Sequence, residues 1–187
     1  MVSAPTIRRS MSRERQSALN SDRIRQVFGS YSVDVLQQQA HLRIASLCSH
    51  HGGRTICRTL AVTLFAESLP DALKDADRRI REGASIGENL RDLGFITQKT
   101  DTHWCSATAG AQFARLTQGE VSAGSLLVAR LYKLVVDHNG ERWEYATIAE
   151  AYHPAHEALN GRTLRAGDTP AMPERHREAL NELLRAL

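Results

Sequence analysis

Two charged residues interrupt segments whose side chains alternate as in a half-buried β-strand. Arg43 shares a strand face with Ala45 and Leu47, and Glu150 shares a strand face with Ile148. A buried ion is costly unless it is paired or used. If the two faces meet in one cavity, the guanidinium could hold a carboxylate through two parallel hydrogen bonds. The partly desolvated glutamate, its pKa raised by burial, could then exchange a proton near neutral pH.

Arg58 is a third candidate for the same site, because it lies on the strand expected to pair with that of Arg43. The structural alternative is that Arg43 and Glu150 are edge-strand charges or a structural ion pair. Composition alone favours that alternative.

Other kinds of site have weaker support in the sequence. No histidine has the spacing of a zinc site, so we expect all of these to be solvated: His50, His51, His103, His153 and His156. The three cysteines lack CxxC spacing and are expected to be reduced and mostly buried. Neither a GxGxxG loop nor a nucleophile elbow is present. We therefore predict neither a metal nor a cofactor.

Composition points to a single globular domain. The chain has 187 residues, of which 42% are hydrophobic and 24% charged, and its formal net charge is +3. Four arginines fall within the first fifteen positions, so the positive charge belongs to a tail and not to a basic body. Nucleic acid is therefore a poor candidate partner. No apolar run reaches the ~18 residues of a membrane span, and the start lacks a secretory signal, so we expect a cytoplasmic protein.

The periodicity predicts five or six strands and four helices. Two dipeptides predict hairpin turns: the glycine pair Gly52-Gly53 and the Asn-Gly pair Asn139-Gly140. Ser21 and Ser85 are predicted to cap helices. Expected strands cover 31–36, 42–48, 55–65, 126–136 and 142–152, with a further one over 95–99; expected helices cover 22–28, 70–81, 85–93 and 173–187, and 106–116 could be another helix.

These elements predict an α+β fold, an antiparallel sheet of five or six strands with helices over it. We expect residues 1–19 to form a flexible basic arm, residues 20–155 the domain, and residues 156–187 a linker and a C-terminal helix packed on the domain.

The ordered set of motifs resembles the chorismate lyase family over about residues 20–154. The resemblance rests on Asn20-Ser21-Asp22 before the Tyr31-Ser32-Val33 strand, on Leu42-Arg43 with Arg58-Thr59 in the paired strand, on Ile86-Gly87 at a helix start, and on Glu150 four residues before Pro154. The family shares its fold with effector-binding domains of bacterial regulators.

The resemblance implies roles for individual residues. The family's carboxylate-binding arginine falls on Arg43 and its catalytic glutamate on Glu150. Its backbone donors to the ligand fall on Asn20 and Ile86, and Arg58 and Gly87 are further candidates for substrate binding. The implied activity is a lyase that needs no cofactor and converts chorismate, or a related enolpyruvyl acid, to pyruvate and an aromatic hydroxy acid such as 4-hydroxybenzoate, a step of ubiquinone biosynthesis.

The sequence departs from the family pattern in four places. Residues 101–127 form a longer segment than expected, and the helix after Pro173 is extra. The other two departures are a short connection and one substituted residue. Only residues 37–41 separate the first two strands, where the family has a long connection, and Ser85 replaces a proline. The alternative is a binding or sensing module of the same fold that takes an aromatic carboxylate without converting it. A third possibility is an interaction protein without a pocket.

Overall fold

The computed structural model describes residues 19–156 and 171–187, which form one six-stranded sheet and five α-helices. The strands are β1 (Ser32–Gln38), β2 (Leu42–His51), β3 (Arg54–Phe65), β4 (Ile96–Thr108), β5 (Leu126–His138) and β6 (Glu141–Tyr152). The helices are α1 (Asn20–Phe28), α2 (Lys74–Arg81), α3 (Ile86–Asp92), α4 (Ala111–Leu116) and α5 (Glu174–Ala186), with a 3-10 turn, η1 (Asp71–Leu73), before α2.

The sheet is antiparallel throughout, in the order β1-β2-β3-β6-β5-β4. It consists of two three-stranded meanders that join where β3 pairs with β6. The two predicted hairpin turns are confirmed. Gly52 and Gly53 have φ values of 56° and 75°, and Asn139 and Gly140 have values of 51° and 84°, the left-handed conformations that such turns require. The predicted α+β class is also confirmed.

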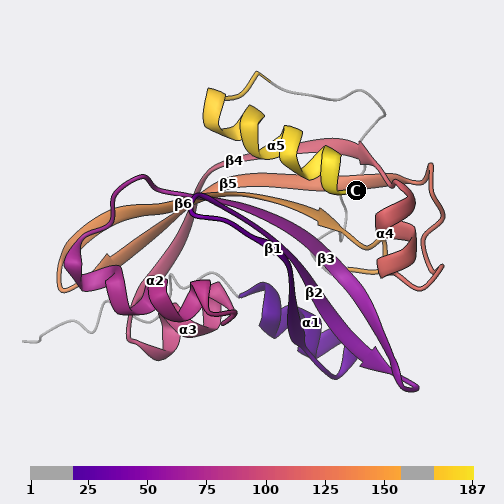
Figure 1. Ribbon diagram of the computed structural model, residues 1–187, viewed down its shortest axis with the longest axis horizontal. Helices are drawn as coiled ribbons and strands as arrows, with labels where there is room; N and C mark the ends of the chain where they lie inside the picture. The colour runs from indigo at the N-terminus through magenta and orange to yellow at the C-terminus, as the bar shows by residue number, and fades with distance from the viewer. Residues whose placement is uncertain (1–18, 157–170) are drawn as a thin grey trace, which may run out of the picture.

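Helices cover the two faces of the sheet unequally (Figure 1). α5 lies over one face, here called the packed face, while α1, α2 and α3 lie under the other, here called the cavity face. α4 lies at one end of the sheet. Because strand residues alternate between faces, each strand supplies one set of side chains to α5 and a different set to α1–α3.

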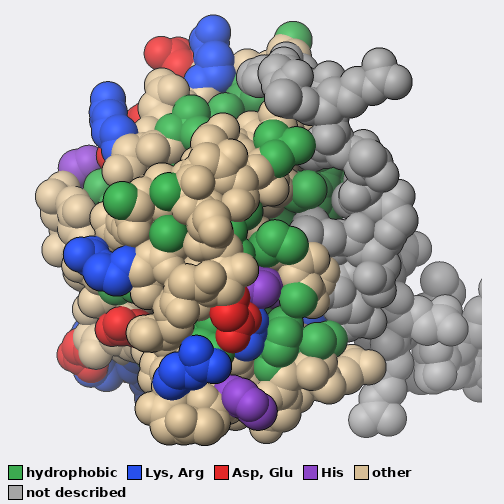
Figure 2. Space-filling view, turned by 90° about the vertical axis from the view of Figure 1, so that its right-hand side faces the viewer, with side chains coloured by type: hydrophobic (Ala, Val, Ile, Leu, Met, Phe, Trp, Pro, Cys, Tyr) green, Lys and Arg blue, Asp and Glu red, His purple; other side chains and the backbone are tan. Residues whose placement is uncertain are grey.

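The surface shows mixed charge on the side seen in Figure 2. Lysine and arginine side chains are scattered among acidic and uncharged ones there, and no basic stripe forms. Within the described residues no helix is long and apolar enough to cross a membrane. Most of the predicted N-terminal arm and of the predicted linker lies outside the described residues.

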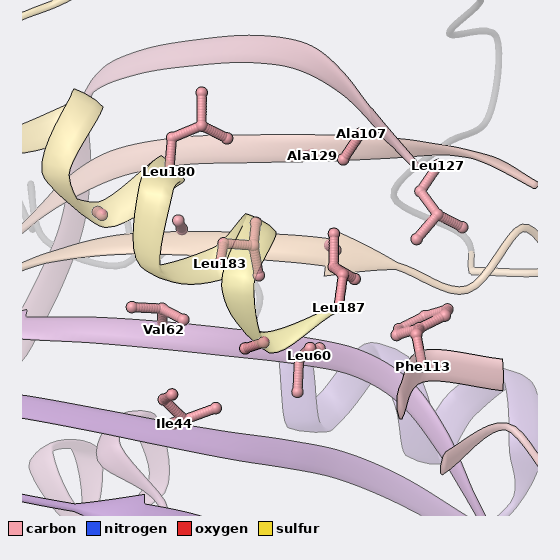
Figure 3. Close-up of a cluster of buried hydrophobic side chains, with 14 of the residues drawn as sticks. Ile44, Leu60, Val62, Ala107, Phe113, Leu127, Ala129, Leu180, Leu183 and Leu187 are labelled. Atoms are coloured by element: carbon pink, nitrogen blue, oxygen red, sulfur yellow. The ribbon is translucent and has the colours of Figure 1, made fainter. Parts of the chain in front are cut away.

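The packed face holds an apolar core (Figure 3). Leu180 and Leu183 of α5 belong to one buried apolar cluster with Leu60 and Val62 of β3 and with small side chains such as Ala129 of β5. Leu187, which follows α5, belongs to the same core, whereas Leu184 of α5 is 48% exposed. Cys48, Cys57 and Cys105 are free and buried, as predicted.

Two sequence predictions about local structure were wrong. Residues 106–108 belong to β4, which runs to Thr108, and α4 begins only at Ala111. A bulge between Thr100 and His103 breaks the period-2 alternation, which hid this strand.

Neither predicted serine cap forms. α1 begins at Asn20, so Ser21 lies inside the helix, where its hydroxyl is buried without a partner. Ser85 does precede α3, but its Oγ lies 3.0 Å from Tyr31 Oη instead of bonding the helix.

Candidate functional site

A cavity of about 90 Å³ lies on the cavity face, between the sheet and the first residues of α1 and α3. Its walls are mostly apolar, and its charged residues are Arg43, Lys99 and Glu150. Arg43 and Glu150, separated by more than one hundred positions in sequence, therefore line one cavity. β2 and β6, which carry them, are interior strands, so these residues are not edge-strand charges.

Small residues create the hollow. Ala45 of β2 pairs directly with Ala61 of β3, and Ala61 pairs with Glu150 of β6. Two adjacent alanines leave space that larger side chains fill elsewhere on the sheet. Leu47 and Ile148 border this space and keep it apolar.

Arg43 is fully buried at one end of the cavity, and it also binds the end of α2. Its Nη1 donates to the carbonyl oxygens of Ile80, at 2.7 Å, and Ala84, at 2.9 Å, while Nη2 lies 3.5 Å from the Gly83 oxygen. Carbonyl groups at a helix C-terminus lack helical partners and attract cations. Burial lowers the pKa of Arg43, yet a guanidinium stays charged in proteins. Its Nε is buried without a partner.

Glu150 is buried at the other end of the cavity. Tyr152 donates a hydrogen bond to Oε2, Asn20 Nδ2 donates one to Oε1 at 3.2 Å, and Lys99 Nζ lies 3.8 Å from Oε2. Burial alone raises the pKa of Glu150, but Lys99, the Tyr152 hydroxyl and Arg130 together hold it below its ordinary value. The predicted upward shift was wrong, because these donors and cations outweigh desolvation.

Lys99 is a site residue that the sequence reasoning missed. It lines the cavity from β4, and its Nζ lies 4.5 Å from the centre of the Tyr132 ring. Burial lowers the pKa of Lys99, and the Glu150 carboxylate opposes that change. The sequence places Lys99 at the end of the predicted 95–99 strand, which could have drawn attention to a charged strand residue. Only the fold shows that the Lys99 side chain faces Glu150.

Asn20, Ile86 and Gly87 also line the cavity. Asn20 starts α1, and Ile86 and Gly87 start α3, so two helix N-termini meet at this place. The first N–H groups of a helix have no partner within it. A Cβ atom on Gly87 would come within 2.9 Å of Leu19 Cδ2, so glycine allows the two helices to approach closely.

Arg58 does not line the cavity. Its Nε donates to Ser49 Oγ at 2.9 Å, and its Nη1 lies 2.7 Å from Glu120 Oε2. The Phe28 ring lies against its guanidinium. These contacts join α1, the sheet and the segment after α4, so the structure places the buried Arg58 in an ion pair with the partly exposed Glu120.

Two histidines predicted to be solvated are buried: His153 and His156. His153 Nε2 lies 3.3 Å from Glu120 Oε2. His156 Nε2 lies 2.7 Å from Asn20 Oδ1. Since Asn20 uses its amide nitrogen toward Glu150, its oxygen accepts from His156. The two histidines are buried through contacts with residues far away in the sequence, which sequence spacing could not show. Within the described residues no group of three or more metal-binding side chains could hold an ion.

No protein-family model matches this chain, and no curated protein matches it significantly. Among solved structures, it is similar to the C-terminal domain of PhnF, with 14% identity and a TM-score of 0.42 over 71% of this chain and 74% of that one. It is also similar to the C-terminal domain of Yurk from Bacillus subtilis, with 14% identity and a TM-score of 0.40 over 73% of this chain and 93% of that one. At this level of similarity, membership of the chorismate lyase family stays a prediction.

Proposed function

We propose that this chain is a binding module for a small cyclic or aromatic carboxylate, held in the cavity between Arg43 and Glu150. The observation that carries the proposal is the buried Arg43 cation beside an apolar hollow. No carboxylate of the described residues forms an ion pair with Arg43, whose contacts are carbonyl oxygens. A ligand carboxylate would balance this charge. It would also accept hydrogen bonds from the Arg43 N–H groups that the carbonyl oxygens do not use.

The helix starts support the same ligand class. The first bonds within α1 and α3 reach from Arg23 to the Leu19 oxygen and from Asn89 to the Ser85 oxygen, so the N–H groups before them stay available. Helix N-termini favour anions. The cavity volume of about 90 Å³ is well below that of pockets for drug-sized molecules, so the ligand must be small.

The state of Glu150 argues against its acting as a proton donor. A carboxyl group with a lowered pKa is ionised near neutral pH and cannot donate a proton there. Glu150 can instead accept a hydrogen bond from a hydroxyl on the ligand. We expect the module to act in the cytoplasm, and its buried free cysteines support that location.

A lyase acting on chorismate is the second candidate. Its support is that Arg43 and Glu150, the two residues to which the family's catalytic roles fall, line the same cavity. Arg43 would hold a carboxylate of the substrate, and Glu150 would accept a proton near the ether and hydroxyl oxygens.

One pair of experiments separates the two candidates. Titration calorimetry with 4-hydroxybenzoate should show saturable binding, while incubation with chorismate should release no pyruvate. Arg43→Gln should weaken binding about tenfold or more, because a charge-assisted hydrogen bond contributes ~1.5–3 kcal/mol. The exposed Arg142→Gln serves as the matched control. Absence of binding would contradict the module, and catalytic release of pyruvate would establish the lyase instead.

A further inference from the structure

A row of three side chains crosses the cavity face at the Glu150 end. Trp104 of β4 pairs directly with Arg130 of β5, and Arg130 pairs directly with Glu150 of β6. The register would allow an ion pair between Arg130 and Glu150, but the guanidinium turns to the rings beside it. Its central carbon lies 5.2 Å from the centre of the Trp104 ring and 5.1 Å from that of Tyr132.

Stacking on the rings covers the faces of the Arg130 guanidinium and leaves N–H groups at its edge available for hydrogen bonds. An arginine that rests on aromatic rings keeps its N–H groups in the guanidinium plane, where they can bind an oxyanion through two parallel bonds. Arg130 Nε is buried without a hydrogen-bond partner. The nearby Tyr152 hydroxyl donates to Glu150 and also interacts with the Arg130 guanidinium, so Nε is the Arg130 donor left without an acceptor. A buried cationic donor without an acceptor is costly, and this cost indicates a missing acceptor.

Positive charge exceeds negative charge around this row. Lys99 lies 3.8 Å from Glu150, and Arg23 of α1 is near enough to lower the pKa of both Lys99 and His156. In the part of the chain that the structure describes, neither Arg23 nor Arg130 forms an ion pair with a carboxylate. Within the described residues, Lys99 and Arg130 therefore lie beside one carboxylate, that of Glu150, and Arg23 adds positive charge near Lys99.

The bulge in β4 builds this arrangement. Lys99 and Trp104 are five residues apart and would face opposite sides of a regular strand. The irregularity between Thr100 and His103 turns both toward the cavity face, and Asp101 within it has a φ of 46°. A left-handed conformation is unfavourable for a residue other than glycine. Strain at this position is consistent with a functional use of the residues that it orients.

We propose that Arg130, with Arg23 and Lys99, forms a second binding site, which takes a small oxyanion such as sulfate, phosphate or a carboxylate group at the Glu150 end of the cavity. Trp104 forms one wall of this site. The site does not depend on which molecule lies between Arg43 and Glu150, and it adds residues that the proposed function does not use.

Trp104 provides a direct readout. The chain has two tryptophans, so Trp143→Phe leaves Trp104 as the single indole reporter. Sodium sulfate should produce a saturable change in Trp104 fluorescence, whereas sodium chloride at equal ionic strength should not. A change that is the same with both salts, or no change, would overturn the site.

Variants in the same background assign the response to Arg130. Arg130→Gln should weaken sulfate binding about tenfold or more, and Arg23→Gln should weaken it less. The exposed Arg177→Gln of α5 should leave it unchanged. If Arg130→Gln does not fold, Arg130→Lys keeps the charge but loses the planar fork, and should still weaken binding. Full sulfate binding in a folded Arg130 variant would refute the proposal.

This experiment is independent of the calorimetry above. Loss of the sulfate response with retained 4-hydroxybenzoate binding would remove the second site alone. A sulfate response without 4-hydroxybenzoate binding would contradict the proposed function and support the second site.

Discussion

The two faces of the sheet are built from the same strands but pack differently. On the packed face, α5 and the even-numbered residues of β3, Leu60, Val62 and Leu64, form a closed apolar core. On the cavity face, the odd-numbered Ala61 and Thr63 leave space between sheet and helices. Arg43 and Glu150 are buried on this second face. Alternation along β3 thus separates the residues of the core beneath α5 from those that line the cavity.

The largest expected effect lies on the packed face. Leu183 is completely buried there, so Leu183→Ala should lower the free energy of unfolding by about 2–5 kcal/mol through the cavity that it opens. Denaturant unfolding measures this loss. Binding of 4-hydroxybenzoate by the folded fraction should stay unchanged. Weaker binding by the folded protein would show that the two faces are coupled.

A matched pair of substitutions compares the faces directly. Ala129→Leu adds atoms to the filled core and should cost about 1–3 kcal/mol of stability, with binding preserved. Ala61→Leu adds the same atoms to the cavity, where space exists, and should cost less while abolishing 4-hydroxybenzoate binding. Thermal unfolding and calorimetry on both variants test this. Equal stability losses would mean that the cavity is effectively filled.

The smallest effect concerns pH and the cavity face. Burial lowers the pKa of His156 from 6.5 to about 4. The unfolded chain therefore binds the proton first as the pH falls. The stability from neutral His156 is complete above pH 6.5 and is lost progressively toward about pH 4.

Between about pH 7 and about pH 5.5 this loss should be about 1 kcal/mol. His156→Gln, which can still donate to Asn20, should flatten that part of the stability profile. His50→Gln, on an exposed turn, should not. An unchanged profile in His156→Gln would show that His156 does not carry the dependence.

The sequence predicted those features that depend on local patterns. Period-2 alternation identified the strand faces of Arg43 and Glu150, and turn chemistry identified both hairpins. The features that it missed depend on distant contacts. The carbonyl partners of Arg43 come from the end of α2, and two of the cations that lower the pKa of Glu150 come from other strands, Lys99 from β4 and Arg130 from β5. The β4 bulge broke the pattern that would have placed Trp104.

The order of the strands has a consequence for folding. Each three-stranded meander contains Arg43 or Glu150 but not both, and within the sheet the meanders join through β3 and β6, whose pairing begins with Thr59 and Tyr152. Pairing between residues so far apart in sequence closes a long loop and is intrinsically slow. A refolding intermediate with both meanders formed but this junction open would have native hairpins and no complete cavity. Recovery of ligand affinity during refolding should therefore coincide with closure of the junction, later than the recovery of strand content.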